Sequence, residues 1–293
     1  MMNDALRNMR FMMECLRNIP ANKSIALGNS GGFCVSTCTK FENWVYFPGC
    51  VNDIETVKAA AEFFSKRNEG FTWPVFDGGN EILSDAGLFY GGKLRAMTLD
   101  SDSVISIRGN DSVTFSAVTS REDSLRWAEC AWHGFEYGKG KPDDDYCAFA
   151  ENLMSCKNFA LYIAVLHGRD CGAFLVSDGD NLSGVYSFAV IPEMRRKGIA
   201  VSMMNEIRRL SHGKKIVLQA EAAGVPFYSA YGFKDAGGIY IFSNSEDYST
   251  KKRLARNSPV NRKISSQLFR NWFSFSNENS LFCLLILPDY SES

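Results

Sequence analysis

A short stretch around residue 190 combines the residue types that bind a phosphate group. An apolar run stops at Pro192, three basic residues follow as Arg195, Arg196 and Lys197, and Gly198 precedes a helix-like pattern. Proline ends a strand because it has no N–H for the ladder, and glycine permits unusual dihedral angles and a close backbone approach. The first N–H groups of a helix lie unpaired at its positive end, where anions bind. The segment therefore predicts a phosphate-binding loop.

The elements that position this loop form a mixed α/β pattern in the second half of the chain. Apolar periodicity predicts strands at 113–118, 159–166, 170–176, 184–190, 215–220 and 238–243, with helices at about 121–136, 143–155, 197–211 and 225–231. The helix after the loop has one apolar face, formed by Ile199, Met203, Ile207 and Leu210. This face predicts that the helix packs on a sheet and holds the loop at its start.

The first hundred residues predict a smaller α/β unit. Its expected elements are helices near 4–17 and 54–66, the second opened by Asp53, and strands at 33–37, 44–47, 71–76 and 94–99. The glycine pairs at 78–79 and 91–92 predict turns. Small polar residues at 100–112 predict a boundary, so we expect domains at 1–110 and 111–245 and an appendix at 246–293. No internal sequence repeat is found, and a structural repeat is left open.

The loop and its surroundings resemble the GNAT superfamily of N-acetyltransferases. The acetyl-CoA loop of that family reads Arg/Gln-x-x-Gly-x-Gly/Ala and is matched by Arg195, Gly198 and Ala200. The family's Val-x-Pro before the loop is matched at 190–192, and its later Tyr-x-x-x-Gly-Phe is matched at 228–233. The likeness covers about 113–244. A solvated basic turn is the alternative for the loop taken alone, and the ordered set of motifs disfavours it.

The resemblance implies a fold and a set of cofactor contacts. The fold is a mostly antiparallel central sheet flanked by helices, preceded by a smaller α/β domain. The resemblance implies that the pantetheine arm of acetyl-CoA lies along Phe188, Ala189 and Val190 and pairs with the backbone of the first and last of these. It implies that the pyrophosphate is held by a longer set: Arg195, Arg196, Lys197, Gly198, Ile199, Ala200 and Val201. Acetyl-CoA is the implied co-substrate, and no metal is implied.

Tyr228 is the implied catalytic acid. In the family, a tyrosine at this place faces the sulfur of the cofactor and assists its departure. A phenol with a pKa near 10 protonates a thiolate whose thiol lies near 8.5 only when it is well positioned, and it can also stabilise the developing charge by a hydrogen bond. The alternative is that Tyr228 is a half-buried packing residue. We interpret Tyr231 as a packing residue.

The base that deprotonates the amine is less well defined by the sequence. Glu221 follows the strand at 215–220, where the family often has an asparagine near the cofactor, and a helix-entry carboxylate is an equal alternative. Glu129 and His133 lie four residues apart on one helix face. They could line the acceptor cleft, although a solvated face is the commoner outcome. Ordered water also serves as a proton acceptor, so no dedicated base is required.

The N-terminal part carries no phosphate loop. Its segment at 71–77 resembles the N-terminal domain of some bacterial tandem GNAT proteins, which implies that this part is a degenerate copy. Its aromatic residues Trp73 and Phe76 could close the acceptor pocket, although alternating strand positions more often place such residues in the core.

Composition limits the other functions of the chain. A formal net charge of −1 gives no reason to expect a nucleic-acid or membrane partner. The nine cysteines are scattered, and the three histidines lie far apart, so we expect reduced, buried thiols and no structural zinc. Acidic residues interrupt the apolar N-terminus, and no apolar run reaches about 20 residues, which predicts a cytoplasmic protein. In the appendix, we expect a solvated basic stretch at 251–270 and a strand at 281–287.

We therefore interpret the chain as an acetyl-CoA-dependent N-acetyltransferase that acts on a primary amine of a small molecule or peptide in a ternary complex. Alternatives are a transferase that uses another acyl-CoA and a non-catalytic acyl-CoA-binding module. A tRNA-dependent aminoacyl transferase of related tandem architecture is disfavoured by the pyrophosphate loop. The identity of the amine acceptor and any oligomer formation are left open.

Overall fold

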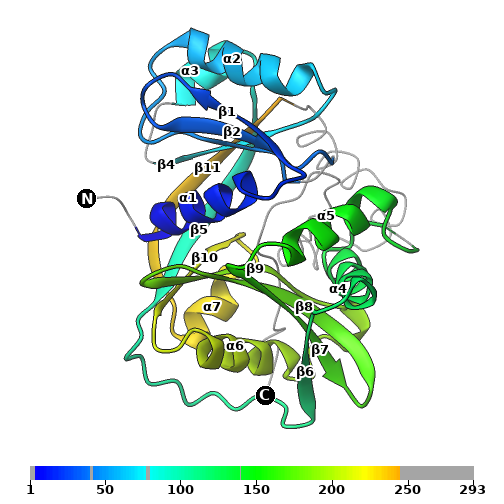
Figure 1. The fold of residues 1–293 in the computed structure, drawn as a ribbon. Coiled ribbons are helices and arrows are strands. Elements are labelled where there is room, and N and C mark those ends of the chain that lie inside the picture. Colours follow the sequence, from blue (N-terminus) through cyan, green and yellow to red (C-terminus); the bar gives the residue numbers. More distant parts are fainter. Residues whose placement is uncertain (1–3, 40–41, 77–79, 139, 245–293) are drawn as a thin grey trace, which may run out of the picture.

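The computed structural model describes residues 4–39, 42–76, 80–138 and 140–244 (Figure 1). The predicted basic stretch at 251–270, the predicted strand at 281–287 and the glycine turn at 78–79 lie outside these described residues. The first half contains helices α1 (Asp4–Arg17), α2 (Ile54–Ser65) and α3 (Asn80–Asp85) and strands β1 (Lys23–Leu27), β2 (Gly32–Ser36), β3 (Trp44–Tyr46), β4 (Thr72–Phe76) and β5 (Phe89–Leu99). These elements form an α/β unit.

The second half contains the elements that position the predicted loop. They are β6 (Val113–Ala117), α4 (Arg121–Gly134), α5 (Asp144–Met154), β7 (Phe159–Leu166), β8 (Arg169–Asp178), β9 (Leu182–Val190), the 3₁₀ turn η1 (Pro192–Met194), α6 (Ile199–Leu210), β10 (Lys215–Ala220), α7 (Val225–Tyr231) and β11 (Lys234–Ser243). Every strand and helix predicted for this half is confirmed. The predicted mixed α/β fold with a mostly antiparallel sheet is also confirmed.

In the first half, two elements were not predicted and one prediction is wrong. The strand β1 and the short helix α3 were not expected from the sequence. The turn predicted at Gly91 and Gly92 is wrong, because both residues lie inside β5. The pairing of β5 with β11 shifts register there, and Gly92 has a φ of 141°. Glycine accommodates such a bulge within a strand, which explains why a turn-like residue pair occurs in a continuous ladder.

The eleven strands in the described part of the chain form one sheet in the order β1-β2-β3-β4-β11-β5-β10-β9-β8-β7-β6. The two halves exchange their last strands within it, because β5 pairs with β10 and β11 pairs with β4. The same series of elements occurs twice: β1, β2, β3, α2, β4, α3, β5 and then β7, β8, β9, α6, β10, α7, β11. The structural repeat that the sequence left open is therefore present. The division of the chain near residue 110 stays a prediction.

Helices cover both faces of this sheet (Figure 1). One apolar core lies between the sheet and α1, α4 and α5, and it includes residues from both halves. On the other face, α6 and α7 cover a second core, while α2 and α3 cover a third one at the opposite end of the molecule. The loop between β9 and α6 therefore belongs to the face of the second core.

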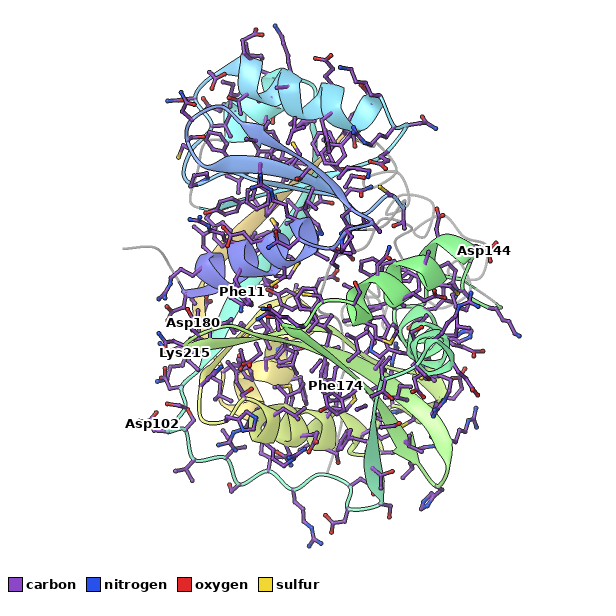
Figure 2. The ribbon with its side chains drawn as sticks, in the orientation of Figure 1. Phe11, Asp102, Asp144, Phe174, Asp180 and Lys215 are labelled. Atoms are coloured by element: carbon purple, nitrogen blue, oxygen red, sulfur yellow. The ribbon has the colours of Figure 1, made fainter. Side chains whose placement is uncertain are left out.

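The helix α1 is fastened to the second half by polar contacts. Asn8 donates a hydrogen bond to the Ser177 hydroxyl and accepts one from the Tyr186 hydroxyl. Lys215, which is labelled in Figure 2, lies at the start of β10, and its Nζ lies 2.9 Å from Asp4 Oδ2. The buried network specifies where α1 lies on the sheet, because a displaced helix would leave these groups without partners.

The cysteine prediction is confirmed only in part. The cysteines within the described residues are all free thiols, but Cys38 and Cys50 are exposed. Both follow a strand end, where the chain turns at the surface. The described residues contain no group of three or more metal-ligating side chains. No helix among them is long and apolar enough to span a bilayer.

Candidate active site

The loop between β9 and α6 presents an uncapped helix start. Gly198 is the N-cap residue of α6 with a φ of 74°, and no side chain caps this helix. Arg196 has a positive φ of 62° as well, and Arg196, Lys197 and Gly198 are exposed. The first N–H groups of α6 are thus left for a ligand, and two exposed basic side chains add positive charge. This geometry supports the predicted phosphate-binding loop. That the loop binds a phosphate group stays a prediction.

The side chain of Arg195 is engaged by the protein. Its guanidinium donates to the backbone oxygens of Val190 and Gly134 at 3.1 and 2.9 Å and pairs with Glu136 at 2.7 Å. These contacts tie the loop to the end of α4. Arg195 therefore shapes the loop through its side chain, and its predicted contact with the pyrophosphate would be made by its backbone.

The segment between β5 and β6 contacts the loop, which the sequence did not predict. The side-chain amide of Asn110 donates to the Lys197 carbonyl at 2.9 Å, and its backbone N–H donates to the Ser202 hydroxyl at 2.8 Å. The Ser202 hydroxyl lies 3.1 Å from the Asn110 carbonyl and 3.2 Å from the Gly198 carbonyl. A side chain at Gly109 would collide with Ser202, because a Cβ there would lie 2.4 Å from its hydroxyl oxygen. The connecting segment therefore holds the loop in place.

Strands β9 and β10 diverge beside the loop. Their parallel pairing runs from Leu182↔Lys215 to Gly184↔Val217, and the described parts of the two strands have no pairing beyond it. Residues 173 and 175 of β8 pair with residues 189 and 186 of β9, so β9 contains an extra residue there, and Ser187 has a φ of 49°. The predicted pantetheine residues, Phe188 to Val190, therefore lie on the diverging part of β9.

The helix α7 brings Tyr228 to the diverging strands. Its ring centroid lies 6.1 Å from that of Phe188 and 5.6 Å from that of Phe233. Tyr228 is 1% exposed, so it is more deeply buried than the half-buried alternative supposed. The structure thus brings together Phe188 and Tyr228, and the catalytic role of the hydroxyl stays a prediction.

Tyr231 is a packing residue of α7. It lies in the same core, and its hydroxyl donates to Asn205 Oδ1 at 2.6 Å. Burial raises the pKa of Tyr231 to about 12. It is therefore poorly suited to proton transfer near neutral pH.

One comparison with known protein families covers this same region. Residues 157–235 match the family model described as an acetyltransferase (GNAT) domain. The match begins before β7, ends in β11, and includes the loop and α7. This chain contains a GNAT domain. Comparison with curated proteins gave no match.

Solved structures are similar in fold to most of this chain. A GCN5-related N-acetyltransferase from Kribbella flavida is 11% identical with a TM-score of 0.58, over 83% of this chain and 96% of its own. A tandem GNAT protein from the clavulanic acid biosynthesis pathway is 15% identical with a TM-score of 0.52, over 79% and 86% of the two chains. A GCN5-related N-acetyltransferase from Sphaerobacter thermophilus is 12% identical with a TM-score of 0.52, over 76% of each. Together with the repeated elements, these likenesses show a tandem GNAT fold.

The candidate bases occupy different environments in the GNAT domain. Glu221 is buried at the turn before α7, where its carbonyl accepts from the N–H groups of Gly224 and Val225. Its place next to the diverging strands keeps it a candidate. Glu129 is exposed on α4 and His133 is half-buried, which fits the solvated-face alternative. In the first half, Trp73 is 1% exposed and belongs to the core under α2 and α3, which favours its packing role.

Proposed function

We propose that this chain transfers an acetyl group from acetyl-CoA to a primary amine of a small molecule or peptide by direct attack in a ternary complex. The observation that carries this proposal is the uncapped, basic start of α6 beside the diverging strands β9 and β10. Arg196, Lys197 and the first N–H groups of α6 would hold the pyrophosphate. The gap between the strands would admit the pantetheine arm and direct the thioester toward Tyr228.

The reaction requires the amine to lose a proton and the CoA thiolate to gain one or to be stabilised as the anion. The amine nitrogen attacks the thioester carbon, a C–N bond forms, and the C–S bond breaks. The ammonium proton passes to water or to Glu221, and the thiolate is stabilised or protonated by the Tyr228 hydroxyl. We assign to Phe188, Ala189 and Val190 the alignment of the pantetheine arm. The loop residues 195–201 supply binding energy rather than proton transfer.

Two alternatives make different predictions. A transferase for a longer acyl-CoA would use the same loop, and its preference would appear as a higher kcat/KM with that thioester. A non-catalytic binding module would bind CoA without turnover. The tyrosine beside Phe188 favours an enzyme, because binding of the pyrophosphate alone does not require it.

The test is an assay of thiol release from acetyl-CoA with a panel of primary amines. The proposal expects CoA release that depends on an added amine and a product that is an N-acetylated amine. Tight CoA binding with no amine-dependent release from acetyl-CoA or longer acyl-CoAs would favour the binding module and contradict the proposal.

A further inference from the structure

Gln219 is a buried side chain whose amide has no partner. It lies on β10 and is 1% exposed, and both Nε2 and Oε1 lack a hydrogen-bond partner among the described residues. A buried carboxamide without partners costs free energy that a folded protein normally recovers through hydrogen bonds. An unsatisfied buried group of this kind indicates a ligand site when it lies at a structural opening.

The position of Gln219 on β10 places it on the face opposite the cofactor loop. Ile216, Leu218 and Ala220 belong to the core under α6 and α7. Because side chains alternate along a strand, Gln219 lies on the other face, which α1 covers. The loop, α6, α7 and Tyr228 all lie on the first face. A group bound on the face of Gln219 therefore does not compete for space with the cofactor loop.

Gln219 lies on β10 just beyond the point where β9 and β10 stop pairing. Parallel pairing ends at Gly184↔Val217, and two residues further along lie Tyr186 on β9 and Gln219 on β10. The hydroxyl of Tyr186 is satisfied by Asn8. Of Tyr186 and Gln219, only Gln219 has a polar group without a partner among the described residues, so it can bind a ligand. The bulge at Ser187 lies next to this pair.

We infer that Gln219 binds the amine acceptor and selects a primary amine that carries a hydroxyl or carbonyl group beside its nitrogen. This inference rests on the proposed acetyl transfer. The carboxamide has one acceptor oxygen and two N–H donors. An amine N–H satisfies Oε1, but the amine lone pair is used for attack, so Nε2 needs a different acceptor atom on the substrate. A neighbouring hydroxyl or carbonyl oxygen supplies it.

Thermal unfolding of Gln219→Met separates a ligand-binding role from a structural one. Methionine has a similar length and no amide, so the variant removes an unsatisfied group without opening a large cavity. We expect its melting temperature to equal or exceed that of the wild type. Asn8→Leu is the matched control, because Asn8 is a buried carboxamide on the same face with both amide atoms bonded. The control should melt at a lower temperature. A lower melting temperature for Gln219→Met would overturn the inference, since it would show a structural partner or bound water.

The specificity arm uses matched amines with acetyl-CoA: phenylalaninamide against 2-phenylethylamine, and 2-aminoethanol against ethylamine. We expect the wild type to prefer the first member of each pair about tenfold or more in kcat/KM. In Gln219→Met this ratio should fall about tenfold, to the value set by the different basicities of the two amines, while the Kd for CoA stays within about twofold. An unchanged ratio in the variant would overturn the inference. If the wild type acetylates no amine, the proposed function fails, and the melting comparison alone decides whether Gln219 is an unsatisfied ligand-facing amide.

Discussion

The two crossover helices of this tandem fold, α2 and α6, start in opposite chemical states. Each connects two parallel neighbours, β3 to β4 and β9 to β10. At the start of α2, Asp53 accepts from the Thr56 N–H and hydroxyl, each at 2.7 Å. At the start of α6, Gly198 provides no side chain, and Arg196 and Lys197 are exposed beside it. One helix start contains its own carboxylate, and the other is left for an anion.

This difference predicts that one topology gives a binding half and a supporting half. A carboxylate cap occupies the N–H groups of a helix start and cancels its positive potential, so a pyrophosphate would be repelled from α2. The helices that follow differ as well, because α7 contains Tyr228 and α3 contains no tyrosine. The comparison predicts one cofactor per chain, held by the second half.

The largest expected effect is on turnover, and it tests the tyrosine that α7 contains and α3 lacks. Tyr228→Phe should lower kcat by about 100- to 10,000-fold, the usual contribution of a positioned acid, with little change in CoA affinity. Single-turnover kinetics would show whether the chemical step is slowed. Tyr231→Phe is the matched control, and loss of its bond to Asn205 should cost about 1 kcal/mol of stability without slowing turnover. Near-normal chemistry in Tyr228→Phe would return this residue to a packing role.

A smaller effect concerns the segment that holds the loop. Asn110→Ala removes the hydrogen bond to the Lys197 carbonyl, and CoA affinity should fall about fivefold, which corresponds to about 1 kcal/mol. Calorimetry measures the change. Asn110→Asp is the control, because it retains the oxygen that accepts from the Ser112 N–H but cannot donate to Lys197. Wild-type affinity in both variants would show that the connecting segment does not position the loop.

The smallest effect concerns the cap of α2. Asp53→Ala should lower the melting temperature by about 2 to 4 °C without changing CoA affinity. The hydrogen bond from the Thr56 side chain lowers the pKa of Asp53. This stabilisation is therefore present at neutral pH and is lost as the pH falls through the lowered pKa. Melting curves of the two proteins should converge in acid, and a gap that persists there would contradict the capping role.

Local patterns carried most of the sequence predictions. The segment around Gly198 is contiguous in the sequence, so the sequence alone predicts its strand, proline, basic loop and helix in order. The same reason makes Asp53 predictable as the start of a helix. Asn110 was missed because its partner Ser202 lies 92 residues away. The exchange of β5 and β11 and the unsatisfied amide of Gln219 depend on tertiary pairing, which one-dimensional periodicity does not contain.

The measurement that tests the central claim most directly is calorimetric titration of the wild type and of Gly198→Trp with CoA. Gly198 has a left-handed φ, and a Cβ there would lie 3.3 Å from Asn110, so tryptophan should distort the loop. The account predicts one CoA per wild-type chain and no measurable binding by a folded variant. Circular dichroism would verify that the variant is folded. Two CoA molecules per chain, or unchanged affinity in Gly198→Trp, would contradict the account.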